Sequence, residues 1–325
     1  MRRVASALLV SLTAATIAFG SACITTHPTP PAVAASRRTF ELPHEIRVRV
    51  AGRITSVPLE QYVLGTALSE VSPVGEPPAT VERIFEVQAI IARTYAAAHV
   101  GRHGREGFDL CDDIHCQLYE PKRIGASRFT EVARDAVQRT RGQILTYDGK
   151  PIEAVFHADC GGYTADASQV WSGPALPYLA GGPDDLPAGA HRTWETSLSA
   201  DQIRKACSVS GTTAVGKRVT NLRIVDRDRS GRVLTVDVEG DRTVRLRGEQ
   251  LRTLLNDAFG AHTLMSTRFT IARSGQTYTF TGSGYGHGVG LCQVGAATRA
   301  RRGESIDEIF AAYFPGASLA QAVEP

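Results

Sequence analysis

The sequence predicts an α+β fold, with mixed helices and an antiparallel β-sheet. Between about Pro58 and His99, apolar residues recur at helical spacing. Between Val219 and Leu246 they instead alternate with polar residues, and glycine-bearing turns separate the runs. The chain has 325 residues, of which 42% are hydrophobic, and this is enough for a substantial core.

The N-terminus has the parts of an export signal. A pair of arginines starts it, residues 4–19 are apolar or small, and further small residues lead to Cys23. The apolar stretch is shorter than the ~20 residues that cross a bilayer comfortably. Residues 1–23 are therefore predicted to be a signal peptide, and the protein is expected to be exported to the cell envelope.

Two interpretations fit Cys23. Lipoprotein signals end in a small residue before a cysteine that becomes lipid-modified, and Ala22 fits, but Gly20 stands where such signals usually carry leucine. A lipid anchor at Cys23 and ordinary cleavage nearby both stay open, and membrane contact is expected only through the signal or this anchor. Residues 24–40 are proline-rich and are expected to form a tether, so the folded domain is placed at 41–320.

The folded domain is predicted to open with a strand and a helix. Residues 46–50 alternate apolar and charged side chains before the turn Ala51-Gly52. A helix is expected from Pro58, since proline suits a first helical turn. One face of it carries a mostly apolar stripe: Leu59, Val63, Thr66 and Glu70. Glu70 ends this stripe, so its carboxyl group is expected to be poorly solvated.

The second predicted helix, 81–99, is apolar most of the way round and should be buried. It carries Arg93, and a buried guanidinium requires a partner. Residues 128–141 are predicted to form another helix. Residues 144–147 and 152–157 are predicted to be strands joined by a turn.

The second half of the domain is expected to hold a β-rich segment at about 219–281. A helix at 248–259 interrupts the strands of this segment. The last helix is expected at about 305–313.

Charge and motif spacing exclude two classes of partner. Lys and Arg number 36 against 33 Asp and Glu, without a basic run, so nucleic acid is not an expected partner. The G-x-G-x-x-G spacing of dinucleotide sites is absent from the glycine-rich stretch 284–290, and no organic cofactor is expected.

The stretch 284–290 has glycine at every second position. If it is extended, one face is bare and a sugar or a neighbouring helix could approach it closely. Some candidate substrate contacts are side chains in or next to this stretch: Tyr285, His287 and Gln293. The others lie in a second glycine-containing signature, residues 156–164: His157 and Tyr163.

A third cluster has the residue types of a metal site. Cys111, His115 and Cys116 offer three zinc ligands within six residues, and His103 or His99 could supply a fourth. A Cys111–Cys116 disulfide is the alternative in an exported protein, but it would leave His115 unexplained, which favours a structural zinc. Of the remaining cysteines, Cys160 and Cys292 lie in the two glycine-rich signatures and are expected to be neighbours, whereas the sequence does not say which thiols are oxidised.

Four stretches of the sequence resemble one family, that of stage II sporulation protein D and the LytB amidase enhancer (SpoIID/LytB). They are Leu59–Gly65 with Ser69-Glu70 and Gln88–Ala96, then Asp109–Tyr119, then Phe156–Thr164, and finally Gly284–Ala296 with Tyr313–Gly316. The resemblance covers 46–319 and implies a glycan-binding cleft. It also implies cleavage of peptidoglycan strands that lack stem peptides, and some members of the family bind zinc at the Cys111 stretch.

The resemblance places the family's catalytic acid on Glu70. A lytic transglycosylase would use this one glutamate to protonate the leaving oxygen and then to deprotonate the muramoyl C6 hydroxyl, which closes a 1,6-anhydro ring. Apolar surroundings raise a carboxyl pKa, which suits an acid near neutral pH. Arg93 could orient Glu70 or contact substrate. A non-catalytic wall-binding enhancer of a partner amidase, or a plain envelope scaffold, remains the alternative.

Overall fold

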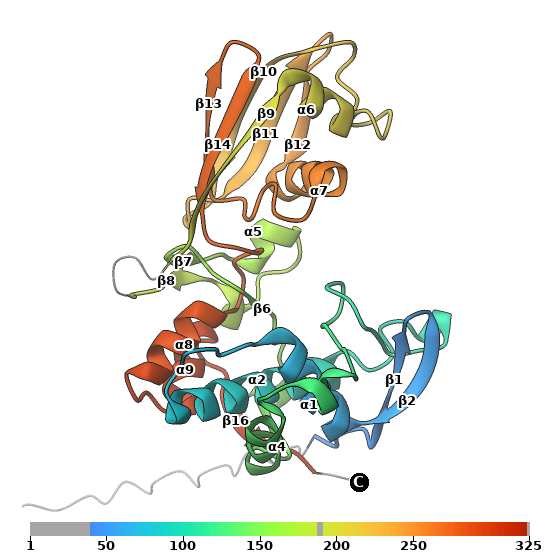
Figure 1. The fold of residues 1–325 in the computed structure, drawn as a ribbon, viewed down its shortest axis with the longest axis vertical. Coiled ribbons are helices and arrows are strands. Elements are labelled where there is room, and N and C mark those ends of the chain that lie inside the picture. The colour runs from blue at the N-terminus through green and yellow to red at the C-terminus, as the bar shows by residue number, and fades with distance from the viewer. Residues whose placement is uncertain (1–39, 187–190, 324–325) are drawn as a thin grey trace, which may run out of the picture. The chain divides into compact units, whose positions relative to one another are not determined.

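The computed structural model describes residues 40–186 and 191–323 (Figure 1). The predicted signal peptide, Cys23 and all but the last residue of the predicted tether lie outside the described residues. A search of the described helices for one with the length and hydropathy of a membrane span finds none.

Helices and mostly antiparallel sheets make up the described residues, which confirms the predicted α+β class. The helices are α1 Leu59–Glu70, α2 Pro78–Ala98, α3 Arg123–Ala126, α4 Thr130–Arg139, α5 Ala167–Trp171, α6 Ala200–Cys207, α7 Gly248–Phe259, α8 Gln293–Arg301 and α9 Ile306–Tyr313, with short 3-10 helices η1 Gly104–Glu106 and η2 Pro177–Leu179. The strands are β1 Glu45–Val50, β2 Arg53–Pro58, β3 Leu110–Cys111, β4 Gln143–Tyr147, β5 Lys150–Pro151, β6 Phe156–His157, β7 Tyr163–Thr164, β8 Gly182–Pro183, β9 Thr193–Ser199, β10 Val219–Arg227, β11 Val233–Gly240, β12 Val244–Arg247, β13 Phe269–Ser274, β14 Thr277–Ser283, β15 Leu291–Cys292 and β16 Ser318–Gln321.

A first hydrophobic core gathers buried side chains from residues 42–179 and 289–322. Helix α2 packs there against β4 and against α1, α4 and α8; these helices are labelled in Figure 1. The prediction that this helix is buried is therefore confirmed. It begins at Pro78, three residues before the predicted start, because proline at the first helical position loses no hydrogen bond.

Strands β1 and β2 form an antiparallel hairpin that leads directly into α1. The predicted turn is confirmed, with φ of 48° at Ala51 and 81° at Gly52. Strand β2 was not predicted, since only Val57 of its side chains is buried and the alternation is weak. Strand β3 pairs in parallel with β1, which places Cys111 opposite Arg49 and brings the cysteine-bearing loop beside this hairpin.

The predicted strand at 152–157 is largely wrong. Lys150 and Pro151 pair with β4, whereas Phe156 and His157 pair in parallel with β15. Between them the chain turns tightly, because the Val155 amide donates to the carbonyl of Glu153 at 2.8 Å. A single strand is replaced by two short ones with different partners.

A second hydrophobic core gathers buried side chains from Trp194 to Phe280. It holds two three-stranded antiparallel sheets, β10-β11-β12 and β13-β14-β9, with α6 and α7 beside them. The predicted β-rich segment starts too late, because β9 and α6 were missed. Both carried a signal: Trp194 and Leu198 alternate with polar residues, and Ser199 with Gln202 forms a capping box.

Candidate functional site

Glu70 ends helix α1, and the segment 117–119 lies against that helix. Gly65 makes room for it, since a Cβ at this position would collide with the ring of Tyr119. The rings of Tyr62 and Tyr119 pack with centroids 5.1 Å apart. The Tyr62 hydroxyl donates to the side-chain oxygen of Gln117 at 3.2 Å. These contacts fix the backbone that follows the cysteine-bearing loop.

The Glu70 carboxylate is half-buried and is held by a backbone donor. The amide of Leu118 donates to Oε1 of Glu70 at 2.7 Å. Burial raises the pKa of Glu70 to about 7, although the Leu118 hydrogen bond opposes this rise. Across residues 40–186 and 191–323, no cation forms an ion pair with Glu70. Near neutral pH, this side chain can therefore both give and take a proton.

Arg93 does not orient Glu70, and this part of the prediction is wrong. Its guanidinium is fully buried and binds Glu60 at the other end of α1, with Nε–Oε1 and Nη2–Oε2 distances of 2.8 and 2.6 Å. It also donates to the carbonyls of Gln143 and Val137. A guanidinium so enclosed is a structural group, and it is not accessible as a substrate contact.

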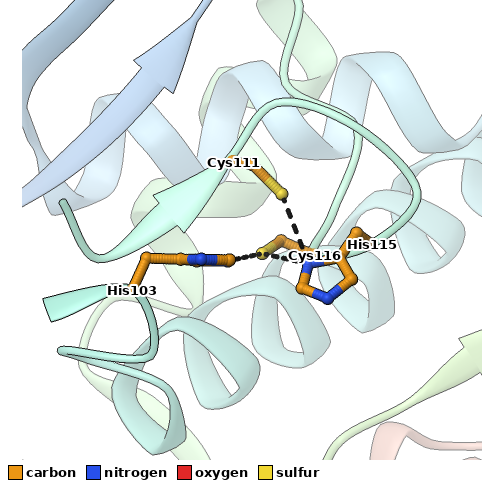
Figure 2. Close-up of side chains that lie close together, drawn as sticks. All are labelled: His103, Cys111, His115 and Cys116. Carbon is orange, nitrogen blue, oxygen red and sulfur yellow. Dashed lines mark hydrogen bonds between the residues drawn. The ribbon is translucent and has the colours of Figure 1, made fainter. Parts of the chain in front are cut away.

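Four side chains of the predicted metal site come together (Figure 2). The ligand atoms of His103, Cys111, His115 and Cys116 all lie within 4.8 Å of one another. The Cys116 thiol lies 3.5 Å from Nε2 of His103, and both thiols lie 3.7 Å from Nδ1 of His115. Two thiols and two imidazoles are the donor set of a structural zinc site.

The surroundings of this cluster favour His103 over His99 as the candidate fourth ligand. Nδ1 of His103 lies 2.8 Å from Oε1 of Glu106, the carboxylate–histidine contact that orients metal-binding imidazoles. His99, the alternative, is engaged elsewhere, with Nε2 2.9 Å from Glu153. Cys111 and Cys116 are both free thiols, in contrast to the disulfide interpretation. Cys116, the last residue of the cluster along the chain, lies two residues before Leu118.

The glycine-rich stretch 284–290 is not extended, so the condition for one bare face is not met. Its four glycines all have positive φ, between 70° and 102°. Each also lies close to a neighbour that a Cβ would strike: Gly284 against the carbonyl of Asp159, Gly286 against His157, Gly288 against Arg232 and Gly290 against the carbonyl of Val155. Glycine is thus required here for both backbone conformation and close packing, against 155–160 for three of the glycines and against Arg232 for Gly288.

The two histidines of the glycine-rich signatures hold these segments together. Nδ1 of His157 lies 3.0 Å from the carbonyl of Val289, and Nε2 of His287 lies 2.9 Å from the carbonyl of Phe156. Burial lowers the pKa of both, to about 3 for His287. Both are therefore neutral near pH 7.

The other three predicted substrate contacts, Tyr285, Tyr163 and Gln293, lie in different parts of the fold. Tyr285 packs on the second core and exchanges backbone hydrogen bonds with Asp159. Tyr163 lies in the short β7–β8 pair. Gln293, in contrast, reaches α2, where its Nε2 lies 3.4 Å from Oε1 of Gln88.

The matches to known protein families include residues of both hydrophobic cores. Residues 49–147 match the family model described as Stage II sporulation protein, and residues 185–290 match a domain of unknown function (DUF8618). The stage II sporulation protein D of Bacillus subtilis is 31% identical over 283 residues, which span 83% of this chain and 76% of that protein. The chain belongs to the stage II sporulation protein D family.

Two further proteins are similar to this chain over most of its length. An uncharacterized protein of Brachyspira hyodysenteriae is 29% identical over 267 residues, covering 82% of this chain and 67% of that protein. The amidase enhancer of Bacillus subtilis is 26% identical over 280 residues, which span 72% of this chain but 37% of the enhancer. The family-model match includes Glu70 and all four side chains of the metal-type cluster.

In this family member, Cys160 and Cys292 are neighbours as predicted. The Cys160 amide lies 3.2 Å from Sγ of Cys292, and both thiols are free and fully buried. Cys207 lies apart, in the second core.

Three residues that contact the predicted site segments were not predicted from the sequence of this family member: Leu118, Arg232 and Gln88. Leu118 acts through its backbone amide, which leaves no trace in a sequence. Arg232, 1% exposed and located just before β11, donates to the carbonyls of Cys160 and Gly286, at 2.9 and 3.4 Å. Gln88 carried a usable signal, because it is a polar residue on a helix that is apolar nearly all round.

Proposed function

We propose that this chain is a lytic transglycosylase that cleaves peptidoglycan glycan strands, preferentially strands without stem peptides. Family membership supports a role at the cell wall. The observation that carries the catalytic proposal is Glu70: a half-buried carboxyl group without a cation partner in the described residues, whose pKa burial raises to about 7.

The first step of the proposed reaction uses protonated Glu70 as a general acid. Because Oε1 accepts the Leu118 amide, Oε2 is the oxygen that carries the proton. Glu70 gives this proton to the glycosidic oxygen as the bond from that oxygen to the muramoyl C1 breaks. The leaving sugar departs as an alcohol, and C1 becomes electron-deficient.

The second step uses the resulting carboxylate as a base. It removes the proton of the muramoyl C6 hydroxyl while that oxygen bonds to C1, and this closes a 1,6-anhydro ring and restores protonated Glu70. No water is consumed. Glycosidases that use water rely on a pair of carboxylates, whereas a single one suffices for this exchange.

We also propose that His103, Cys111, His115 and Cys116 hold a structural zinc ion. The support is the two-thiol, two-imidazole donor set and the Glu106 contact on His103. The ion would close the loop that carries Leu118, and would thereby keep the amide donor in place beside Glu70. Export to the envelope, with or without a lipid anchor at Cys23, would place the protein at its substrate.

Product analysis in H₂¹⁸O tests the reaction type. Purified protein is incubated with peptide-free glycan strands, and the fragments are examined by mass spectrometry. Anhydromuramoyl ends without ¹⁸O are expected, because the nucleophile is internal. Reducing ends that carry one ¹⁸O would instead identify a hydrolase and overturn the proposal.

The same assay addresses a binding role, which the relative named amidase enhancer suggests. No cleavage by the folded wild-type protein, together with stimulation of an added amidase on intact peptidoglycan, would assign the enhancer function.

A further inference from the structure

A small hollow opens between α2 and α8, beside the end of α1. Its lining is apolar apart from two glutamines: Val71, Ile84, Val87, Gln88, Leu291, Gln293, Ala296 and Ala297. Val71 directly follows Glu70, so the hollow borders the end of α1 that carries Glu70. A glycan strand bound at Glu70 would therefore pass near this hollow.

The Gln88 side chain in this hollow lacks a partner for its amide nitrogen. Gln88 is 2% exposed, and its Oε1 faces Nε2 of Gln293 at 3.4 Å. Its own Nε2 is buried, and within the described part of the chain it has no hydrogen-bond partner. A buried, unpaired donor is costly in a folded protein, and it points to a ligand acceptor.

We propose that this hollow binds the acetamido group of an amino sugar. The methyl group would pack on the apolar wall formed by Ile84, Val87 and Leu291, and the carbonyl oxygen would accept from Nε2 of Gln88. Gln293 acts as a positioning residue, because its amide fixes which end of Gln88 faces the ligand. This inference rests on the proposed function, and it names the substituent by which the glycan strand is placed against Glu70.

A cycle of substrate and protein changes tests the inference. Peptide-free strands are used as isolated and after removal of their N-acetyl groups, with wild type, Gln88→Leu and the exposed control Gln138→Leu. Gln88→Leu should slow cleavage of the N-acetylated strands by roughly 10–100-fold and leave cleavage of the free-amine strands unchanged. Gln138→Leu should match wild type on both.

Equal slowing on both strands would mean that Gln88 only supports the fold, and slowing on neither would remove it from the site; either result overturns the inference. N-formyl strands give a test that needs no variant, since they lack only the methyl group. The wild-type protein should cleave N-formyl strands at least roughly 4-fold more slowly than N-acetyl strands. Equal rates would show that the methyl group does not pack on the apolar wall of the hollow. A wild type that yields no anhydro product on any strand would instead refute the proposed function itself.

Discussion

Helix α1 carries a glutamate near each end, and the two differ in what surrounds them. Glu60, in the first turn, binds the buried guanidinium of Arg93 through both carboxylate oxygens. Glu70, at the last position, receives one backbone hydrogen bond and no cation among the described residues. The same residue type on the same helix is thus a fixed ion-pair partner at one end and a carboxyl group with a raised pKa at the other. The surroundings, a buried guanidinium for Glu60 and burial without a cation partner among the described residues for Glu70, account for the difference.

The largest expected effect is on catalysis at the Glu70 end. Glu70→Gln keeps the shape but can neither donate a carboxylic proton nor accept one, so release of anhydromuramoyl product should fall ~10²–10⁴-fold. Glu131→Gln, at an exposed position of α4, is the matched control and should retain the wild-type rate. Undiminished product from a well-folded Glu70→Gln protein would move the chemistry to another residue.

The Glu60 end should respond in stability instead. Glu60→Gln leaves the buried Arg93 without its charge partner, which should lower the free energy of unfolding by roughly 3–5 kcal/mol. Urea denaturation measures this loss. Cleavage per folded molecule should stay within a few-fold of wild type, and a loss below about 1 kcal/mol would show that the ion pair is not needed.

The raised pKa of Glu70 predicts a pH-dependent cost to the fold. Ionisation of a carboxyl group whose pKa rises from 4.5 to about 7 on folding destabilises the protein as pH increases through that window. Glu70→Gln should therefore be more stable than wild type at pH 8, by on the order of 3 kcal/mol, and equally stable near pH 4. A constant difference at both pH values would contradict the assigned cause.

Loss of the proposed zinc should reduce the cleavage rate less than loss of Glu70, because the ion would act only through the position of the Leu118 amide. Cys116→Ser should abolish metal binding and loosen the Leu118 amide, which should slow cleavage about 10–100-fold. Cys207→Ser, in the second core, is the control and should keep both metal content and rate. Elemental analysis and product release check both variants, and a metal-free wild type would refute the site.

Features of the fold and of the candidate site that depend on residues close in sequence could be predicted from local patterns. The apolar stripe of α1 indicated that Glu70 would be poorly solvated, in agreement with its raised pKa. Helix α7 has the predicted bounds, because its apolar period and its flanking glycines are all local. The spacing of Cys111, His115 and Cys116 likewise brought three of the four clustered side chains together.

Contacts between distant residues were beyond the sequence. Arg93 and Glu60 are 33 positions apart, and nothing local distinguished Glu60 from Glu70 as the partner of a buried guanidinium. The glycine-rich stretch allowed both an extended and a turning backbone. The positive φ values follow from its packing against 155–160, which a single segment does not reveal.

The ionisation of Glu70 is the most direct test of this account. ¹³C NMR titration of the glutamate carboxyl carbons can follow it, with its signal assigned by its absence from Glu70→Gln. The expected midpoint is about 7. A midpoint near the ordinary glutamate value of about 4.3 would contradict it, because the carboxyl group would then be ionised at neutral pH and could not act as the acid.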